Sequence, residues 1–158
     1  MTGSWQLGAF AIILDADRRV LLCHRRDLDV WNLPGGGVES RETPWDAVVR
    51  EVREETTLVV AMERLAGIYS KPDQAELVFS FVCTILAGAP TLTDEADEIA
   101  YFALDEVPRN TSIKQFERIR DALGADLRLH LKVQVGPSSR DRAEHGIAIP
   151  REPRANGG

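Results

Sequence analysis

The chain has 158 residues, of which 44% are hydrophobic and 28% are charged, and this balance is typical of one globular domain rather than of a disordered or fibrous chain. Its 19 Lys and Arg residues against 25 Asp and Glu residues give a net charge of −6, which argues against holding nucleic acid by general attraction to phosphates. No apolar run reaches the roughly 18 residues of a membrane helix, and residues 1–7 lack the basic start and apolar stretch of a signal peptide.

The two cysteines, Cys23 and Cys83, both lie in apolar runs. We therefore expect buried free thiols in a reducing compartment, with a disulfide or a redox role as the less favoured alternative. Together with the composition, this predicts a cytoplasmic protein that acts on neither membranes nor nucleic acid.

The first predicted elements are two short strands. Apolar residues fill positions 7–14 and 20–23, and the turn-like cluster at 15–18 between them predicts a β-hairpin. Residues 31–34 then lead into three consecutive glycines at 35–37, which predict a loop because glycine permits backbone conformations that other residues avoid.

A helix is predicted directly after this loop. Thr43 is a good N-cap residue, Pro44 suits the first helical position, and Asp46 can serve as the acidic member of a capping box. The helix is expected to run to about Glu55 or Thr56.

The following segments alternate between strand and helix patterns. Apolar residues at helical spacing follow Ser112 and stop at Gly124, which predicts a second helix. Strands that flank one helix in mid-chain, with a second helix late in the chain, predict an α/β (α+β) fold. Segments rich in branched or aromatic residues predict the strands at residues 65–69, 77–86 and 99–104.

Apolar and polar residues alternate over residues 127–135, which predicts a strand with one wet face. Such a strand can extend the edge of the sheet or pair with the sheet of a second copy, and we favour a homodimer. Residues 136–158 are rich in Pro, Gly and Arg, which predicts a poorly ordered tail after a domain of residues 1–135.

Three glutamates on the first predicted helix point to chemistry. Glu51, Glu54 and Glu55 are spaced i, i+3, i+4, which places them on one face. They repel one another, and the helix dipole disfavours negative charge near the C-terminus. A hard divalent cation such as Mg²⁺ would relieve this repulsion because it takes oxygen ligands. Arg50, four residues before Glu54, can orient or partly neutralise a carboxylate.

This stretch resembles the Nudix box, the signature of hydrolases that act on nucleoside diphosphates linked to another moiety. The family pattern is G-x5-E-x7-R-E-U-x-E-E-x-G-U, where U is a bulky apolar residue. Thr57 stands where the family has glycine. A β-branched residue in the left-handed conformation common there costs about 1–2 kcal/mol, so we expect a different helix end or tolerated strain. The matching positions are Gly36, Glu42, Arg50, Glu51, Val52, Glu54, Glu55 and Leu58.

The resemblance, which in a looser form covers about residues 5–124, implies a Nudix-type α/β/α sandwich with a mixed sheet between helices. It implies Mg²⁺-dependent hydrolysis of a pyrophosphate bond in a nucleoside diphosphate derivative, with Mn²⁺ able to substitute. The implied substrates are small molecules: nucleoside triphosphates, ADP-ribose or nucleotide sugars.

The resemblance also assigns roles to individual residues. Arg50 is expected to orient Glu51, which is a metal ligand or the base that activates water, and Glu42 is structural or a more distant ligand. The implied metal ligands are the Gly35 carbonyl and the carboxylates of Glu51, Glu54 and Glu55.

A further catalytic carboxylate is expected from a loop outside the box, as is common in the family. The acidic cluster at residues 94–98 lies in the right region. We favour Glu98 and then Glu95, and a solvated acidic loop is the alternative for each.

Substrate contacts are expected at two places. Arg25 and Arg26 end the second strand, where the family often places a phosphate-binding arginine, with a solvated pair as the alternative. The backbone of Gly36 and Gly37 can approach a ligand closely. Trp31 can stack on a base, but core packing is favoured.

Two hypotheses compete with the enzyme. A catalytically silent Nudix-like module that binds or senses nucleotides would typically lack carboxylates of the box, whereas all three glutamates are present. A structural domain with a solvated acidic helix is the other alternative. Pro72 lies close to the place where ADP-ribose hydrolases often carry a proline, but an ordinary turn explains it equally well.

Overall fold

The computed structural model describes residues 3–137 of the chain. The predicted tail lies outside these residues apart from Gly136 and Pro137, so the domain boundary at 135 stays a prediction. Neither helix of the described part has the length and apolar content needed to cross a membrane. The elements in chain order are β1 (Gln6–Ile13), β2 (Val20–Arg25), β3 (Trp31–Asn32), β4 (Gly35–Gly37), α1 (Pro44–Thr56), β5 (Val59–Lys71), β6 (Glu76–Ala87), β7 (Ala96–Phe102), α2 (Ile113–Leu123) and β8 (His130–Val133).

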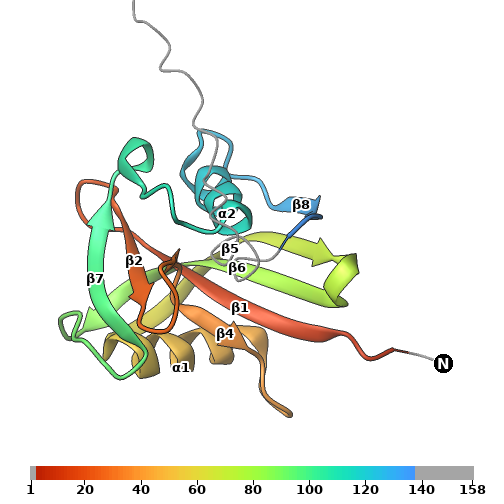
Figure 1. Cartoon of the computed structure of the whole chain (residues 1–158), viewed down its shortest axis with the longest axis horizontal. Coiled ribbons are helices and arrows are strands. Elements are labelled where there is room, and N and C mark those ends of the chain that lie inside the picture. The colour runs from red at the N-terminus through yellow and green to blue at the C-terminus, as the bar shows by residue number, and fades with distance from the viewer. Residues whose placement is uncertain (1–2, 138–158) are drawn as a thin grey trace, which may run out of the picture.

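The strands form two sheets between the two helices. The larger sheet is mixed, with the order β4-β1-β6-β5-β8, and the smaller one has the order β3-β2-β7. In the larger sheet, β1 and β6 are parallel, as are β5 and β8, and the remaining pairs are antiparallel. Figure 1 shows α1 on one side of the strands and α2 on the other. This arrangement confirms the predicted α/β/α sandwich with a mixed sheet.

Two hydrophobic clusters fill the spaces under the helices. One joins α1, through Val48 and Val52, to the strands. The other joins α2, through Ile119, to the opposite side of the strands and includes Trp31. Burial of Trp31 in this cluster supports the core-packing interpretation of that residue, and the two free cysteines are buried as expected.

The predicted hairpin of the first two strands is present only at its turn, where the Asp15 N–H donates to the Arg19 carbonyl at 3.0 Å. β1 and β2 belong to different sheets, and a single bridge between Leu14 and Val20 joins their ends. β1 is a central strand with β4 on one side and β6 on the other, so both of its edges are already hydrogen-bonded. The sequence pattern identified the strands, but it carried no information about their partners.

The three glycines at 35–37 also differ from expectation. They form the edge strand β4, which pairs antiparallel with β1 instead of making a loop. A Cβ atom on Gly35 would collide with the backbone carbonyl of Ala9, and one on Gly36 would collide with the Glu51 carboxylate. The lack of side chains therefore permits close approach of β1 and α1 to this strand.

α1 begins and ends as the sequence predicted. The Thr43 hydroxyl accepts a hydrogen bond from the Asp46 backbone N–H at 3.1 Å, and Pro44 is the first helical residue. Thr57 lies just past the end with φ 65° and ψ −1°, and its N–H donates to the Arg53 carbonyl at 2.9 Å. The helix therefore ends in the left-handed conformation, and the protein tolerates a threonine there.

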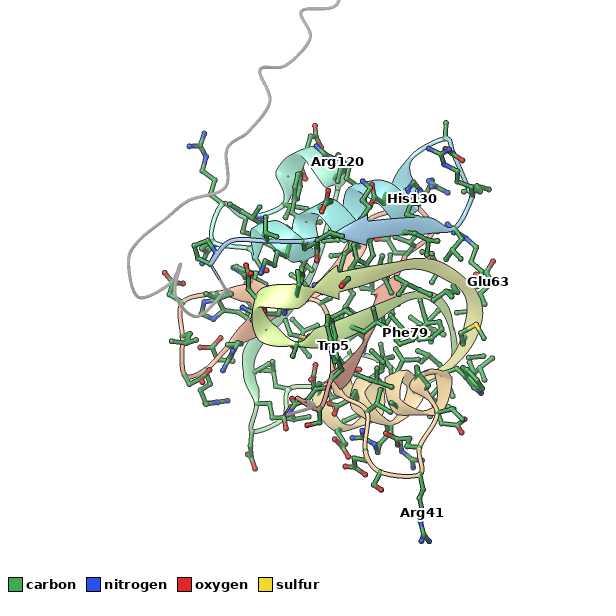
Figure 2. The ribbon with its side chains drawn as sticks, turned by 90° about the vertical axis from the view of Figure 1, so that its right-hand side faces the viewer. Trp5, Arg41, Glu63, Phe79, Arg120 and His130 are labelled. Atoms are coloured by element: carbon green, nitrogen blue, oxygen red, sulfur yellow. The ribbon has the colours of Figure 1, made fainter. Side chains whose placement is uncertain are left out.

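The last strand is shorter than predicted and faces the opposite way. β8 spans four residues at the edge of the larger sheet, parallel to β5. Leu131 and Val133 are 69% and 66% exposed, whereas Lys132 reaches inward to Asp121 of α2 at 2.9 Å. Figure 2 shows β8 alongside α2. Because α2 presents polar groups to β8, the polar side chains of the strand turn inward and the apolar ones face solvent.

Replacing Thr57 by glycine is expected to raise the free energy of unfolding by about 0.5–1 kcal/mol. Relief of the left-handed strain contributes about 1–2 kcal/mol, and the greater freedom of glycine in the unfolded chain offsets part of it. Equilibrium urea unfolding measures the change. Arg53→Gly, at an exposed position inside the helix, is the control and should lower stability by about 1 kcal/mol. A Thr57→Gly variant as destabilised as this control would contradict the strain argument.

Candidate active site

Two glutamates of α1 lie against the glycine strand β4. The Gly35 N–H donates a hydrogen bond to Oε2 of Glu55 at 3.2 Å. A Cβ atom added to Gly36 would come within 2.7 Å of the Glu51 carboxylate, so only glycine leaves room for that side chain. The helix therefore presents these carboxylates to the strand that precedes it.

Arg50 connects the acidic groups of this region. Its Nε and Nη2 donate to the two carboxylate oxygens of Glu42 at 2.7 and 2.8 Å. Its Nη1 donates to Glu51 at 3.0 Å and to Glu54 at 3.2 Å, and Nη2 also reaches the Gly37 carbonyl at 3.0 Å. The guanidinium lowers the pKa of Glu42 to about 2, so this pair stays ionised at neutral pH.

The pKa of Glu55 shifts in the opposite direction from that of Glu42. The pKa of Glu55 is raised to about 8, mainly by burial and also by the negative charges of Glu51 and Glu95, and the hydrogen bond from the Gly35 N–H only partly opposes these effects. Burial also raises the pKa of Glu51, against the effect of Arg50. The site therefore gathers acidic groups whose negative charges, once ionised, no cationic side chain fully compensates.

This charge suits a divalent cation. Carboxylate oxygens are the ligands that Mg²⁺ prefers, and a bound cation favours the ionised forms that burial disfavours. In residues 3–137, no three His, Cys, Asp or Glu side chains already converge as a metal site. Glu54 bonds to Arg50 instead, so it has to turn away from the guanidinium before it can serve as a ligand.

A pocket of about 840 Å³ opens beside Glu55, a volume typical of small-molecule sites. Its walls come from both sheets and from α2. Acidic and basic groups contribute to the same cavity. The charged and polar lining residues include Arg25, Arg26, Glu55, Lys71, Glu76, Asp94, Glu95, Lys114, Gln115 and Arg118.

The family of the chain follows from a match to known proteins. The model of the NUDIX domain matches residues 4–122, which is about three quarters of the sequence. The chain belongs to the Nudix hydrolase family.

Its relatives share both sequence and fold. A MutT-like protein of Streptomyces ambofaciens is 32% identical over 122 residues, which cover 75% of this chain and 79% of the relative. An ADP-ribose pyrophosphatase of Methanocaldococcus jannaschii is 35% identical over 104 residues, 61% of this chain and 62% of that protein. The crystal structure of an ADP-ribose pyrophosphatase from Streptococcus suis matches with a TM-score of 0.65 and 26% identity, covering 80% of this chain and 98% of that chain.

The structure brings most of the expected Nudix box residues together. Gly35, Arg50, Glu51 and Glu55 meet between β4 and α1, whereas Glu54 is half-exposed and lies on the Arg50 side. The resemblance implied that Glu51, Glu54 and Glu55 hold one metal together with the Gly35 carbonyl; Glu51 and Glu55 lie against the glycine strand, whereas Glu54 does not.

The acidic cluster at residues 94–98 contains residues that line the pocket and residues that do not. Glu95 lines the pocket and raises the pKa of both Glu51 and Glu55. Glu98, the residue that the sequence favoured, is exposed on β7 opposite His24 and is not a lining residue. The choice between them depended on strand register, which the sequence pattern did not fix.

Of the expected substrate contacts, the two arginines line the pocket and the two glycines do not. Arg25 and Arg26 both line the pocket, with Arg25 paired to Asp27 and Arg26 bonded to the Ala96 carbonyl. Gly36 and Gly37 are not lining residues; the Glu51 carboxylate lies against Gly36, and Arg50 donates to the Gly37 carbonyl.

Sequence reasoning missed the basic wall of the pocket. Lys114 and Arg118 of α2 are buried and line the pocket, as does Lys71 at the end of β5. The prediction of this helix used only the spacing of its apolar residues and assigned no role to its cationic ones. The spacing i, i+4 of Lys114 and Arg118, next to buried Ile119, is the signal that identifies a shared face.

The metal-free protein is expected to lose stability as pH rises from 4.5 to about 8, through Glu55. Over this range the folded state retains the Glu55 proton, whereas the unfolded chain has lost it. The folded state therefore binds more protons, and the free energy of unfolding falls with rising pH.

Urea unfolding in the presence of a chelator, at about pH 5 and about pH 8, measures this slope. Glu55→Gln should reduce the slope, whereas Glu63→Gln, at an exposed position on β5, should leave it unchanged (Figure 2). Parallel pH curves for the wild type and Glu55→Gln would contradict the assignment.

Proposed function

We propose that this Nudix hydrolase cleaves a pyrophosphate bond in a nucleoside diphosphate derivative, with Mg²⁺ as its cofactor and Mn²⁺ as a substitute. The observation that carries the proposal is the contact of Glu51 and Glu55 with the glycine strand, beside a pocket of nucleotide size. ADP-ribose is the first substrate to test, because two of the similar proteins are ADP-ribose pyrophosphatases.

The proposed metal ligands are the Gly35 carbonyl and the carboxylates of Glu51, Glu54 and Glu55. A metal bound there supplies neutralisation of phosphate oxygens and a lower pKa for a bound water. Arg50 fixes the carboxylate of Glu51 in place and, through Glu42 and the Gly37 carbonyl, fixes the helix against β4.

A carboxylate that accepts the proton of the attacking water is also required. Glu51 is one candidate, as a side chain held by Arg50, and a residue of the acidic segment is the other. Within that segment, the pocket lining favours Glu95 over Glu98. Arg25 and Arg26, which line the same pocket, are proposed to contact the phosphates.

The alternative of a catalytically silent binding module has less support. Such a module has no need to keep a carboxylate whose pKa is raised by burial and by neighbouring carboxylates, since burying an uncompensated charge costs stability. Retention of Glu51, Glu54 and Glu55 together favours the enzyme.

Hydrolysis of a panel of ADP-ribose, nucleotide sugars and nucleoside triphosphates, with and without Mg²⁺ or Mn²⁺, tests the proposed function. Turnover is expected only with a divalent metal, and Glu54→Gln and Glu55→Gln should each lower kcat at least about a hundredfold because they remove a ligand. Glu63→Gln is the matched control with normal activity. Full turnover in both ligand variants would contradict the assigned roles.

We also propose the homodimer that the sequence favoured, with a cytoplasmic location remaining a prediction. β8 is the last strand of its sheet in the described part of the chain, and its apolar side chains face outward. An open edge beside an apolar surface suits pairing with a second copy.

Sedimentation analysis is expected to give twice the chain mass of 17.5 kDa for the wild type. Leu131→Lys should give the single chain mass, because a charge on β8 opposes edge pairing. Leu86→Lys, at an exposed leucine on β6, is the control and should remain dimeric. A monomeric wild type would exclude this proposal.

A further inference from the structure

Three cationic side chains stand in the pocket on the side of α2. Lys114 and Arg118 are only 8% and 2% exposed, and Lys71 joins them from the end of β5. All three line the cavity that also contains Glu55. Burying a cation costs free energy unless opposite charge surrounds it, so the partners of these side chains indicate their role.

The available carboxylates do not balance these charges. Glu76 pairs with Lys71 at 3.3 Å, and it is the lining carboxylate nearest to the cluster. Within residues 3–137, no ion pair shorter than 4.0 Å joins Lys114 or Arg118 to a carboxylate, although Asp73, Glu76 and Glu117 act on them from further away. Glu117 is bonded to Lys132 and Gln134 instead.

Neutral groups hold the two buried cations. Nε and Nη2 of Arg118 both donate to Oε1 of Gln134, at 3.2 and 2.9 Å. The guanidinium lies 5.5 Å from the ring centre of Phe10 and 5.4 Å from that of Tyr69. Lys114 donates to the Gly136 carbonyl at 3.0 Å. These contacts fix the positions of the cations without neutralising them.

Burial disfavours the charged forms of both cations. Burial lowers the pKa of Arg118 to about 10. Burial likewise lowers the pKa of Lys114, and the positive charges of Lys71 and Arg118 lower it further. A bound anion would favour the charged forms of both side chains.

The basic cluster is close to the proposed metal site but separate from it. Phe10, whose ring faces Arg118, is the register partner of Gly35 in the β1–β4 pair. One aromatic side chain therefore stands between the glycine strand and the guanidinium. A substrate whose pyrophosphate lies at Glu55 has a second part within reach of α2.

We propose that Lys114 and Arg118 form a subsite for an anionic group of the substrate other than its scissile pyrophosphate. This inference rests on the proposed function. It names the substrate class as nucleoside diphosphate derivatives that carry an additional carboxylate or phosphate, either on the distal moiety or on the nucleoside. Lys71, already paired with Glu76, adds to the field of the subsite.

Two matched substrate pairs test the subsite. UDP-glucuronate against UDP-glucose adds a carboxylate to the distal sugar, and ADP-ribose 2′-phosphate against ADP-ribose adds a phosphate to the nucleoside. In one of the two pairs, the kcat/KM of the anionic substrate is expected to be at least about tenfold higher than that of its neutral partner, because a hydrogen bond between charged groups in a buried site contributes that much. The pair that responds identifies which part of the substrate carries the anion.

Variants at Lys114 connect the preference to the cluster. Lys114→Met should bring the ratio within the responding pair close to one, Lys114→Arg should retain it, and Lys132→Met, at a lysine that pairs with Asp121 outside the pocket, should leave it unchanged. The ratio is insensitive to partial misfolding because both members of a pair meet the same enzyme. Ratios near one in both pairs, or a ratio that Lys114→Met does not change, would overturn the subsite.

A binding measurement without metal separates this inference from the proposed function. Thermal unfolding in a chelator should show a larger stabilisation by the anionic member of the responding pair, and Lys114→Met should abolish the difference. If this preference appears but no substrate is hydrolysed with any metal, the proposed function fails and the subsite stands. If hydrolysis occurs without preference in either assay, the function stands and the subsite fails.

Discussion

Mutual repulsion among the carboxylates of α1 is the constraint on which the site depends. The guanidinium of Arg50 bonds to three glutamates, Glu42, Glu51 and Glu54. The bidentate contact with Glu42 is the strongest of these, since it is the main cause of the low pKa of that carboxyl. Glu55 lies outside this network and stays uncompensated, which is why a cation suits its position.

The layered fold explains how opposite charges come to share one pocket. α1 approaches the strands from one side and delivers Glu51 and Glu55 to the edge strand β4. α2 approaches from the other side and delivers Lys114 and Arg118. A pocket between such groups can bind a molecule that carries both a metal-bound pyrophosphate and another anion. In the function proposed above, the acidic and basic walls would divide the recognition of one substrate between the two helices.

The site also depends on backbone positions that favour glycine, and the chain has glycine at one of them and threonine at another. Gly36 has no room for a side chain because the Glu51 carboxylate occupies that space. At the other end of α1, Thr57 takes the left-handed conformation that glycine would adopt more easily. The first substitution would displace a proposed ligand, whereas the second affects only local strain. The chain keeps the glycine of the family pattern at residue 36 and departs from the pattern at residue 57, where the effect is confined to local strain.

The sequence alone determined what depends on residues close together along the chain. The N-cap at Thr43, the end of α1 at Thr56 and the common face of the glutamates follow from local hydrogen bonds and helical periodicity. The pairing of β1 with β6 instead of β2, the position of Glu95 rather than Glu98 in the pocket and the outward face of β8 were decided by tertiary structure. Each of these depends on which distant segment supplies a hydrogen-bonding edge or a polar surface. Tertiary packing likewise placed the cationic residues of α2 in the pocket. Periodicity reports that a strand or helix has two faces, but the element packed against it decides which face is buried.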